Sequence, residues 1–485
     1  MKRKILIPII AVLSLLYIES CKVGPNYQKI EVPTEESYRF NTATTEADTV
    51  LNIRWWELFN DPVLDTLITI ALEQNKDVLI AASRIEQARA KLGFTKADMW
   101  PKIDYSANYG YGNLLLGQNT GGAQENIFAG GSLTWELDFW GKFRRANESE
   151  RANLLATEYG YRSVQMGLIS TVANSYFQLL DFQMRLEISK KTLGMRDSSL
   201  YIIEQRFDYG IIPAIDVNQA EIQKAIAQSS VPLYERAVAQ TENAMSVLLG
   251  INPGAIVVGA DLLDQPLPDT IPTGLPSVLL ARRPDILQAE QNVVSQNALI
   301  GVAVAQRFPA ISLTGILGVA SNEFSSLFTG GAAWSVGGNL LGPLFHFSKN
   351  KRRVEIERAK TEQTVYEYEK TVLNAFREVE DALVGIETLK RELSAREDQM
   401  NAAVNARELS AQRYDKGVTS YLEVLETQRS AFDAELLYSN TLQQLFNSYI
   451  NLYNALGGGW VSDAEEQEAA RLEQEKAAEE AAKGQ

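Results

Sequence analysis

The sequence contains two near-copies of one segment, residues 206–221 and 413–428, which lie 207 positions apart. Four identities keep the copies in one register: Arg206, Asp208, Gly210 and Val217 recur as Arg413, Asp415, Gly417 and Val424. In each copy a glycine interrupts helix-forming sequence and supplies the positive φ that ends one helix, and a second helix resumes within a few residues. One copy alone would indicate only a turn that reverses the chain. Two copies indicate a repeated helical hairpin, with tips at about 206–216 and 413–426.

Each tip belongs to a larger repeated unit, about 61–250 in the first copy and about 278–457 in the second. Within each unit, apolar and polar residues alternate with the period of two that is typical of strands. The expected strands are at about 103–112, 128–140, 311–320 and 332–344, with a polar loop at 113–126 between the first two. The segment 142–206 has no proline, and a helix of that length would measure about 100 Å. Such helices pack side by side rather than in a compact globular core.

The alternating strands leave two interpretations open when only the residues are considered. Leu133 and Trp135 share one side, and Thr134 and Glu136 share the other. This pattern suits either a half-buried soluble hairpin or the strands of an outer-membrane barrel. Four strands cannot close a barrel, and an open edge in hydrocarbon would leave backbone groups unpaired at several kcal/mol each. If these strands lie in a membrane, the chain must therefore oligomerise around a common axis.

The first twenty residues have the layout of a secretion signal. Basic residues at positions 2–4 precede an apolar run from Ile5 to Ile18, which is too short to span a bilayer comfortably. Ser20 precedes the sole cysteine, Cys21, as in a bacterial lipobox. We therefore expect residues 1–20 to be a signal peptide.

We expect Cys21 to carry a covalent lipid and to begin a lipid-anchored, extended segment at 21–60. Glu19 departs from the small or apolar residue that is usual in a lipobox. The residue after the cysteine is Lys22 rather than an aspartate, and this resembles lipoproteins that are sorted to the outer membrane.

Composition excludes several classes of site. The net charge of −15 argues against nucleic acid as a partner, because phosphate binding needs clustered Lys and Arg. A single cysteine excludes an internal disulfide. The only histidine, His346, is expected to be structural, so we expect no metal site, no catalytic site and no cofactor besides the lipid. A Pro-rich linker is expected at 251–277 and an acidic tail at 458–485.

Several motifs together resemble one family, and the resemblance covers nearly everything from Cys21 to about Trp460. They are Cys21-Lys22-Val23-Gly24-Pro25-Asn26-Tyr27, Trp55-Trp56, Phe59-Asn60-Asp61-Pro62, Arg282-Arg283-Pro284-Asp285-Ile286, Phe308-Pro309 and the tip at 413–428. The chain is similar to TolC-like outer-membrane efflux proteins, in the lipoprotein branch paired with RND-type pumps.

The resemblance implies a mainly helical fold with a membrane β-barrel part. It implies a homotrimer in which three times four strands form one twelve-stranded barrel in outer-membrane lipid, with twelve helical columns forming a tunnel into the periplasm. It also implies passive conduction without catalysis, driven by an inner-membrane RND-type pump through a periplasmic adaptor protein. The equatorial region would contain the Pro-rich linker.

The resemblance also assigns roles at the tips. Glu423 and Glu426 are three residues apart and share a helix face, and they would line a constriction with Asp216. The alternative is a solvated helix start, where the helix dipole favours acids. Arg413 and Tyr414 would hold the closed tip by hydrogen bonds and ion pairs to neighbouring helices. The turns at Gly210 and Gly417 would contact the adaptor.

Three other functions remain to be weighed. Within the channel class, the chain could be a conduit for protein secretion. A secreted structural protein could use long coiled-coil hairpins for adhesion, but the strands and the signal argue against it. A periplasmic hydrolase using Asp208 and Asp216 has little support, because the sequence shows no catalytic histidine or nucleophile motif near them.

Overall fold

The computed structural model describes residues 22–33, 38–39, 55–115, 118–267, 280, 282–329 and 331–458. The expected signal peptide, Cys21, residues 268–279 of the linker and the tail beyond residue 458 lie outside the described residues. The described part forms two compact units, and each unit draws on both sequence repeats. One unit comprises described residues within 22–32, 83–159 and 288–370, and the other comprises those within 33–82, 160–287 and 371–458.

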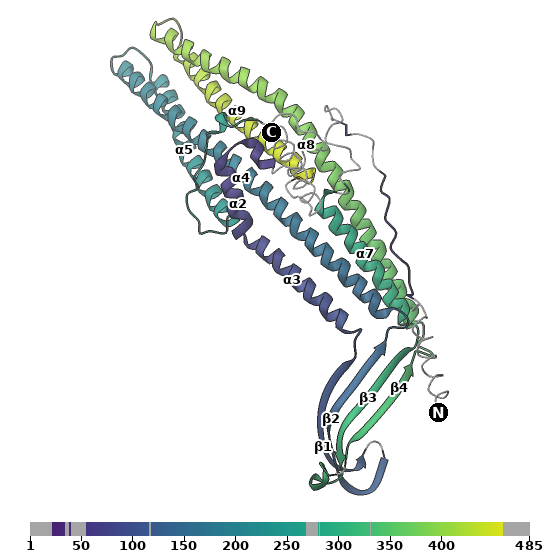
Figure 1. Ribbon diagram of the computed structural model, residues 1–485. Helices are drawn as coiled ribbons and strands as arrows, with labels where there is room; N and C mark the ends of the chain where they lie inside the picture. Colours follow the sequence, from purple (N-terminus) through teal and green to yellow (C-terminus); the bar gives the residue numbers. More distant parts are fainter. Residues whose placement is uncertain are drawn as a thin grey trace, which may run out of the picture. The chain divides into compact units, whose positions relative to one another are not determined.

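The four strands form one antiparallel sheet in chain order, within the first unit (Figure 1). They are β1 (Lys102–Leu115), β2 (Gln118–Leu137), β3 (Ala310–Ser321) and β4 (Ala333–Leu341). The central pair, β2 and β3, joins the first repeat to the second and places Trp135 opposite Leu313. β1 and β4 each pair with one strand only in the described part of the chain, so this sheet has two unpaired edges.

Several strand ends differ from the sequence prediction, and β1 extends to Leu115 while β2 already ends at Leu137. β2 begins at Gln118, inside the segment that was predicted to be a polar loop. This part of β2 pairs with β1, with Glu125 opposite Tyr111. Backbone hydrogen bonds between strands need no apolar side chains, so composition alone underestimated the strand. β4 ends at Leu341, shortly before Pro343, which has no N–H to donate to a neighbouring strand.

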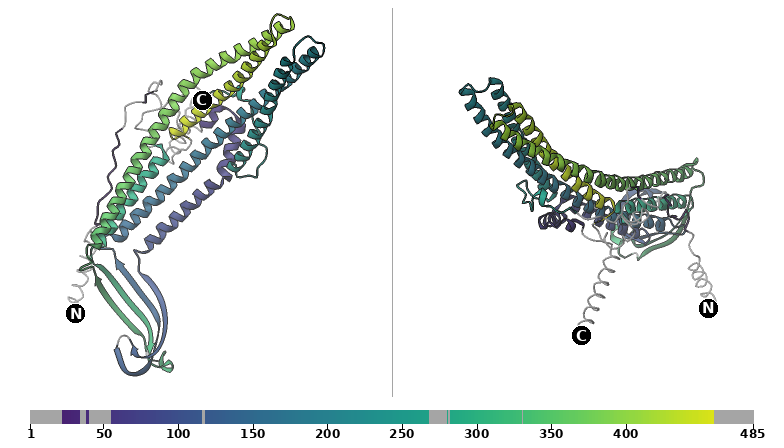
Figure 2. Two further views of the ribbon diagram at one scale, coloured as in Figure 1. Left: turned by 180° about the vertical axis from the view of Figure 1, so that it is seen from behind. Right: turned by 90° about the horizontal axis from the view of Figure 1, so that it is seen from above.

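Helices of identical length recur at one spacing in the two repeats. α4 (Lys142–Asp208) and α8 (Lys349–Asp415) have 67 residues each, and α5 (Ala214–Leu248) and α9 (Tyr421–Ala455) have 35 each. Shorter helices of 22 residues, α3 (Lys76–Ala97) and α7 (Pro284–Ala305), are also equivalent, at an offset of 208 rather than 207. Figure 2 shows α4 with α5, and α8 with α9, as two long hairpins. The predicted fold class, two repeats that each contain long helices and two strands, is confirmed.

None of the helices in the described ranges combines the length and the apolar sequence that are needed to cross a membrane.

The core of the second unit includes residues from both repeats. Phe59, at the end of η1 (Trp55–Phe59), is fully buried. Its ring centroid lies 5.1 Å from that of Phe177, whose ring stacks on Phe446 at 4.4 Å. Because Phe177 belongs to α4 and Phe446 to α9, burial of these rings fastens the two hairpins together.

Asp61 is a buried carboxylate that begins α2 (Pro62–Gln74). It caps the helix by accepting hydrogen bonds from the backbone N–H groups of Val63 at 2.9 Å and Leu64 at 3.3 Å. It also accepts from the Tyr176 hydroxyl at 2.5 Å and from Gln265 Nε2 at 2.7 Å. These donors offset the cost of burying the charge and join the start of α2, α4 and the chain around residue 265.

Candidate functional site

The strand register separates the sheet into two chemically different faces. One face carries rows of mutually opposite residues that are mostly apolar: Ile103, Leu133, Gly315 and Val336 form one row, and Tyr105, Gly131, Leu317 and Trp334 form the next. The other face carries rows such as Asp104, Ser132, Ile316 and Ser335, or Lys102, Thr134, Thr314 and Gly337. The two faces have the division that is typical of a sheet between hydrocarbon and water.

The apolar face is exposed in the single chain. Tyr105 is 94% exposed, Val336 82% and Trp334 74%. Contiguous exposed apolar surface of this kind marks contact with a membrane or another protein.

The two hairpin tips have the same backbone. Gly210 has a φ of 71° and Gly417 a φ of 70°, a region that favours glycine. In the first tip the N–H of Ile211 donates to the carbonyl of Arg206 at 2.9 Å, and in the second the N–H of Val418 donates to the carbonyl of Arg413 at 2.9 Å. These bonds close the helix ends in the same way in both repeats.

A buried apolar cluster holds the two hairpins together just below the tips. Its members come from α4, α5 and α9: Leu200, Ile203, Ala220, Tyr421, Val424 and Leu425. Tyr414 packs against this cluster, with its ring 5.4 Å from that of Tyr421. Burial, together with the neighbouring Tyr414 and Asp216, raises the pKa of Tyr421 to about 12.

The structure brings two of the predicted gate residues together within the second hairpin. Arg413 Nε lies 3.6 Å from Glu423 Oε1, and the hydroxyl of Thr419 donates to the same carboxylate. Glu426 instead pairs with Arg429, one turn further along α9, at 2.7 Å. Both carboxylates therefore already have a cationic neighbour in their own chain.

Tyr414 contributes to the packing of the tip through its ring rather than its hydroxyl group. Its hydroxyl is buried and has no hydrogen-bond partner among the described residues. The guanidinium of Arg206 lies 4.6 Å from the centre of the Tyr414 ring, a cation–π arrangement. Asp216 is half-buried in the first turn of α5.

Sequence analysis placed Arg206 and Tyr421 within the tip segments but assigned neither of them a role in holding the tips together. The repeat itself could have indicated Arg206, since it is the equivalent of Arg413. Nothing in the sequence alone indicated that Tyr421 would be buried between hairpins. Within the described part of the chain, no group of three or more His, Cys, Asp or Glu side chains is placed to hold a metal ion.

Comparison with known proteins adds the decisive observation. The family model described as outer membrane efflux protein matches residues 67–251 and 275–458, one match in each repeat. The chain belongs to the outer membrane efflux protein family.

Individual members of the outer membrane efflux protein family match over nearly their full length. "Cation efflux system protein CusC" of Escherichia coli K12 is 33% identical over 452 residues, which is 92% of this chain and 97% of that protein. "Probable outer membrane lipoprotein SilC" of Salmonella typhimurium is 31% identical over 463 residues, 93% of this chain and 99% of that one. The solved structure of the outer-membrane channel OprN, 29% identical, superposes with a TM-score of 0.83 over 91% of this chain and 100% of that chain.

Family membership confirms the predicted resemblance and decides the interpretation of the strands. The protein is a TolC-like outer membrane efflux channel that extends into the periplasm. This family role is not enzymatic. The soluble-hairpin and adhesion interpretations are therefore set aside.

Proposed function

We propose that three copies of the chain form the closed wall of one channel. The observation that carries the proposal is the sheet, which has one exposed apolar face and unpaired edges at β1 and β4. In hydrocarbon those edges would leave backbone groups unsatisfied at several kcal/mol each. Pairing β1 of one copy with β4 of the next removes both edges. Three copies supply twelve strands, and their long hairpins supply the twelve helical columns of the tunnel.

The proposed channel conducts passively as the outer-membrane part of a tripartite exporter. An inner-membrane RND-type pump supplies the driving force, and a periplasmic adaptor engages the turns at Gly210 and Gly417. Exposed apolar residues beside these turns support a docking role: Tyr209 is 79% exposed, Ile211 68% and Val418 65%. No residue is assigned a catalytic role.

The proposed periplasmic constriction lies at the tips. Asp216, Glu423 and Glu426 line it, and three copies concentrate carboxylates that favour cations. Arg413 and Tyr414 hold the closed state, supported by the pairing of Arg413 with Glu423 and by the packing of Tyr414 against the buried cluster.

The proposed channel is lipid-anchored at Cys21. The relative SilC is named a lipoprotein, which supports this assignment. The lipid is the only non-protein group that we assign to the chain.

The experiment that tests the proposal measures the mass of the detergent-extracted protein and the conductance of the same sample in a planar bilayer. We expect three times the chain mass and a pore that is mostly closed without partners. A well-folded monomer that stays in solution without detergent would contradict the trimer. Affinity purification from cells should also recover an adaptor and a pump, and their absence after mild cross-linking would contradict the tripartite assignment.

A further inference from the structure

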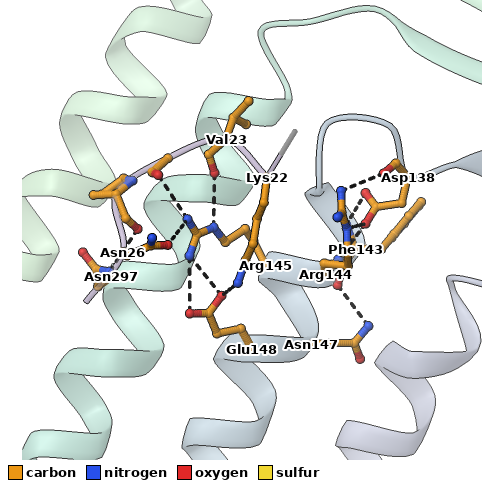
Figure 3. A network of polar contacts seen from close by, with 12 residues as sticks. Lys22, Val23, Asn26, Asp138, Phe143, Arg144, Arg145, Asn147, Glu148 and Asn297 are labelled. Atoms are coloured by element: carbon orange, nitrogen blue, oxygen red, sulfur yellow. Dashed lines mark hydrogen bonds and ion pairs between the residues drawn. The ribbon is translucent and has the colours of Figure 1, made fainter. Parts of the chain in front are cut away.

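The six residues that follow Cys21 contact the N-terminal part of α4 and also α7, and Figure 3 shows Lys22, Val23 and Asn26 beside Arg145 of α4 and Asn297 of α7. Arg145, in the first turn of α4, is only 1% exposed and donates to this segment three times. Its Nε lies 3.1 Å from the carbonyl oxygen of Val23, and its Nη2 lies 3.0 Å from that of Gly24. Nη2 also lies 2.9 Å from Asn26 Oδ1. A buried guanidinium whose donors are used in this way fixes the backbone that it contacts.

Further contacts hold the same segment along its length. The N–H of Val23 donates to the carbonyl of Trp140 at 3.3 Å. Asn297 Nδ2 donates to the carbonyl of Pro25 at 3.3 Å, and the Tyr27 hydroxyl donates to Glu290 Oε1 at 2.9 Å. Asn297 and Glu290 both belong to α7, so both helices take part in holding the segment.

The charges at the start of the segment are paired. Lys22 forms an ion pair with Glu148, which also accepts from Arg145 Nη1 at 3.0 Å. Burial by itself would raise the pKa of Glu148, but the hydrogen bonds and positive charges of Lys22 and Arg145 outweigh burial and lower it. The carboxylate therefore stays ionised and keeps Lys22 in place.

The segment also approaches the backbone of α7 closely. Gly24 has a φ of 96°, and a Cβ added to it would lie 2.5 Å from the Cα of Gly301. A Cβ added to Gly301 would lie 2.7 Å from Cγ and Cδ of Arg145. Only glycine at both positions allows this close approach of the segment 22–27, α7 and Arg145.

The hydrogen bond between Val23 and Trp140 places the segment at the end of the sheet. Trp140, whose carbonyl binds Val23, lies three residues after the end of β2. Its Nε1 donates to the carbonyl of Pro309 at 2.8 Å, directly before β3, and its ring stacks on Phe308 at 4.5 Å.

We propose that the segment Lys22–Tyr27, which we call the strap, and the residues of α4 and α7 that bind it form a built-in docking site that holds the lipid of Cys21 at the helix-side end of the sheet. The proposal rests on the proposed lipid anchor and membrane sheet. Arg145 is the central positioning residue, since it binds three of the six strap residues and Glu148. Acyl chains attached there enter the bilayer where the apolar face of the sheet begins, so the anchor and the sheet share one depth.

Limited trypsin digestion of the detergent-extracted full-length protein tests the docking. Lys22 and Lys29 both have exposed side chains, so Lys29 serves as an internal reference and a difference in cleavage reports how firmly the backbone at Lys22 is held. Cutting after Lys29 creates a new terminus at Ile30, and peptide 23–29 appears only when Lys22 is cut too. We expect peptide 23–29 to form at least about ten-fold more slowly than the Ile30 terminus, a factor that corresponds to about 1.4 kcal/mol. Equal rates in the native trimer would overturn the docking.

Substitutions in the strap and its binding residues show whether the docking causes the slow cleavage. Arg145→Ala should bring the two cleavage rates to within about two-fold of each other. Arg145→Lys should give a rate ratio between those of the native chain and Arg145→Ala, because one ammonium group cannot replace the several N–H donors of a guanidinium. Gly24→Ala changes only the strap and should act like Arg145→Ala, so the test survives if the arginine variant does not fold. Gly167→Ala is the matched control, since a Cβ there has nothing within 4 Å. If Lys22 stays protected from trypsin in Gly24→Ala, the proposed close packing of Gly24 against Gly301 is wrong.

A second experiment separates positioning of the lipid from simple docking. A Gly-Ser-Gly-Ser insertion between Cys21 and Lys22 leaves the strap intact but frees the anchor, whereas the same insertion after Lys29 leaves both unchanged. We expect the first insertion alone to lower the amount of assembled trimer in the outer membrane several-fold, with Lys22 still protected. Equal trimer yields would overturn the positioning role. The mass of the N-terminal peptide reports acylation separately, so a protected Lys22 next to an unmodified Cys21 would overturn the anchor without affecting the channel assignment.

Discussion

Arg206 Nη2 in the first hairpin lies 3.4 Å from Asp415 Oδ1 in the second. Its repeat equivalent, Arg413, pairs instead with Glu423 inside its own hairpin. The two tips share one backbone, yet equivalent arginines serve different contacts. One joins the hairpins, and the other neutralises a carboxylate beside the proposed constriction.

Asp415→Asn removes the ion pair between hairpins. Because the Asp415 side chain is 70% exposed, we expect a loss of no more than about 1 kcal/mol. That loss would raise the open fraction of the tips by up to about five-fold, as measured by single-channel conductance without partners. The matched control is Asp197→Asn, which breaks the Lys224–Asp197 pair within the first hairpin. Similar leakiness in both variants would contradict a specific role for the contact between hairpins.

Arg413 and Glu423 should affect ion selectivity in opposite directions. Glu423→Gln removes a carboxylate and should lower cation selectivity, whereas Arg413→Gln leaves that carboxylate without its cation and should raise it. Reversal potentials across a salt gradient measure both effects. Glu392→Gln, 23 residues before the end of α8, is the control and should leave selectivity unchanged. Shifts of the same sign in the two tip variants would reject this arrangement.

Asp61→Ala should destabilise the second unit. The substitution removes the cap of α2, leaves the Tyr176 hydroxyl without its acceptor and removes one of the two acceptors of Gln265 Nε2. We expect a loss of about 2–4 kcal/mol, from the cap and the unsatisfied donors together. Urea or thermal unfolding in detergent should show a clearly lower midpoint. Exposed Glu73→Ala on the same helix should stay within about 0.5 kcal/mol, and equal midpoints for the two variants would refute the role of Asp61.

Tyr421 should make the tips sensitive to alkaline pH. Its pKa is about 12 in the folded chain, against about 10 when unfolded, so the buried neutral phenol contributes stability below pH 10. That contribution, about 2–3 kcal/mol, is lost as the pH rises from 10 through 12. Tyr421→Phe should therefore lose less stability over this window than the native chain. Unfolding midpoints at pH 8, 10, 11 and 12 measure the difference, with exposed Tyr201→Phe as control. Parallel curves for Tyr421→Phe and the native chain would show that the phenol is not buried as described.

Most of the fold could be predicted from the internal repeat of the sequence and from the spacing of its apolar residues. An offset of 207 between Gly210 and Gly417 is also the offset between α4 and α8 and between α5 and α9. Helices, turns and alternating strands could be predicted because φ preferences and side-chain period are local properties that neighbouring residues encode. Strand length was less predictable: the Gln- and Gly-rich start of β2 forms because β1 lies beside it.

Only the tertiary structure decided which residues meet. The sequence indicated Arg413 and Glu423 as tip residues, but it could not show that Arg206 reaches Asp415, 209 positions away. It indicated Cys21 as an anchor, but not that Arg145 binds the residues after it. Such pairs depend on the packing of separate helices, which sets distances and burial, and burial sets how strongly two charges interact. The local sequence pattern therefore determined the helices, strands and turns, and the packing of distant segments determined which of their side chains meet.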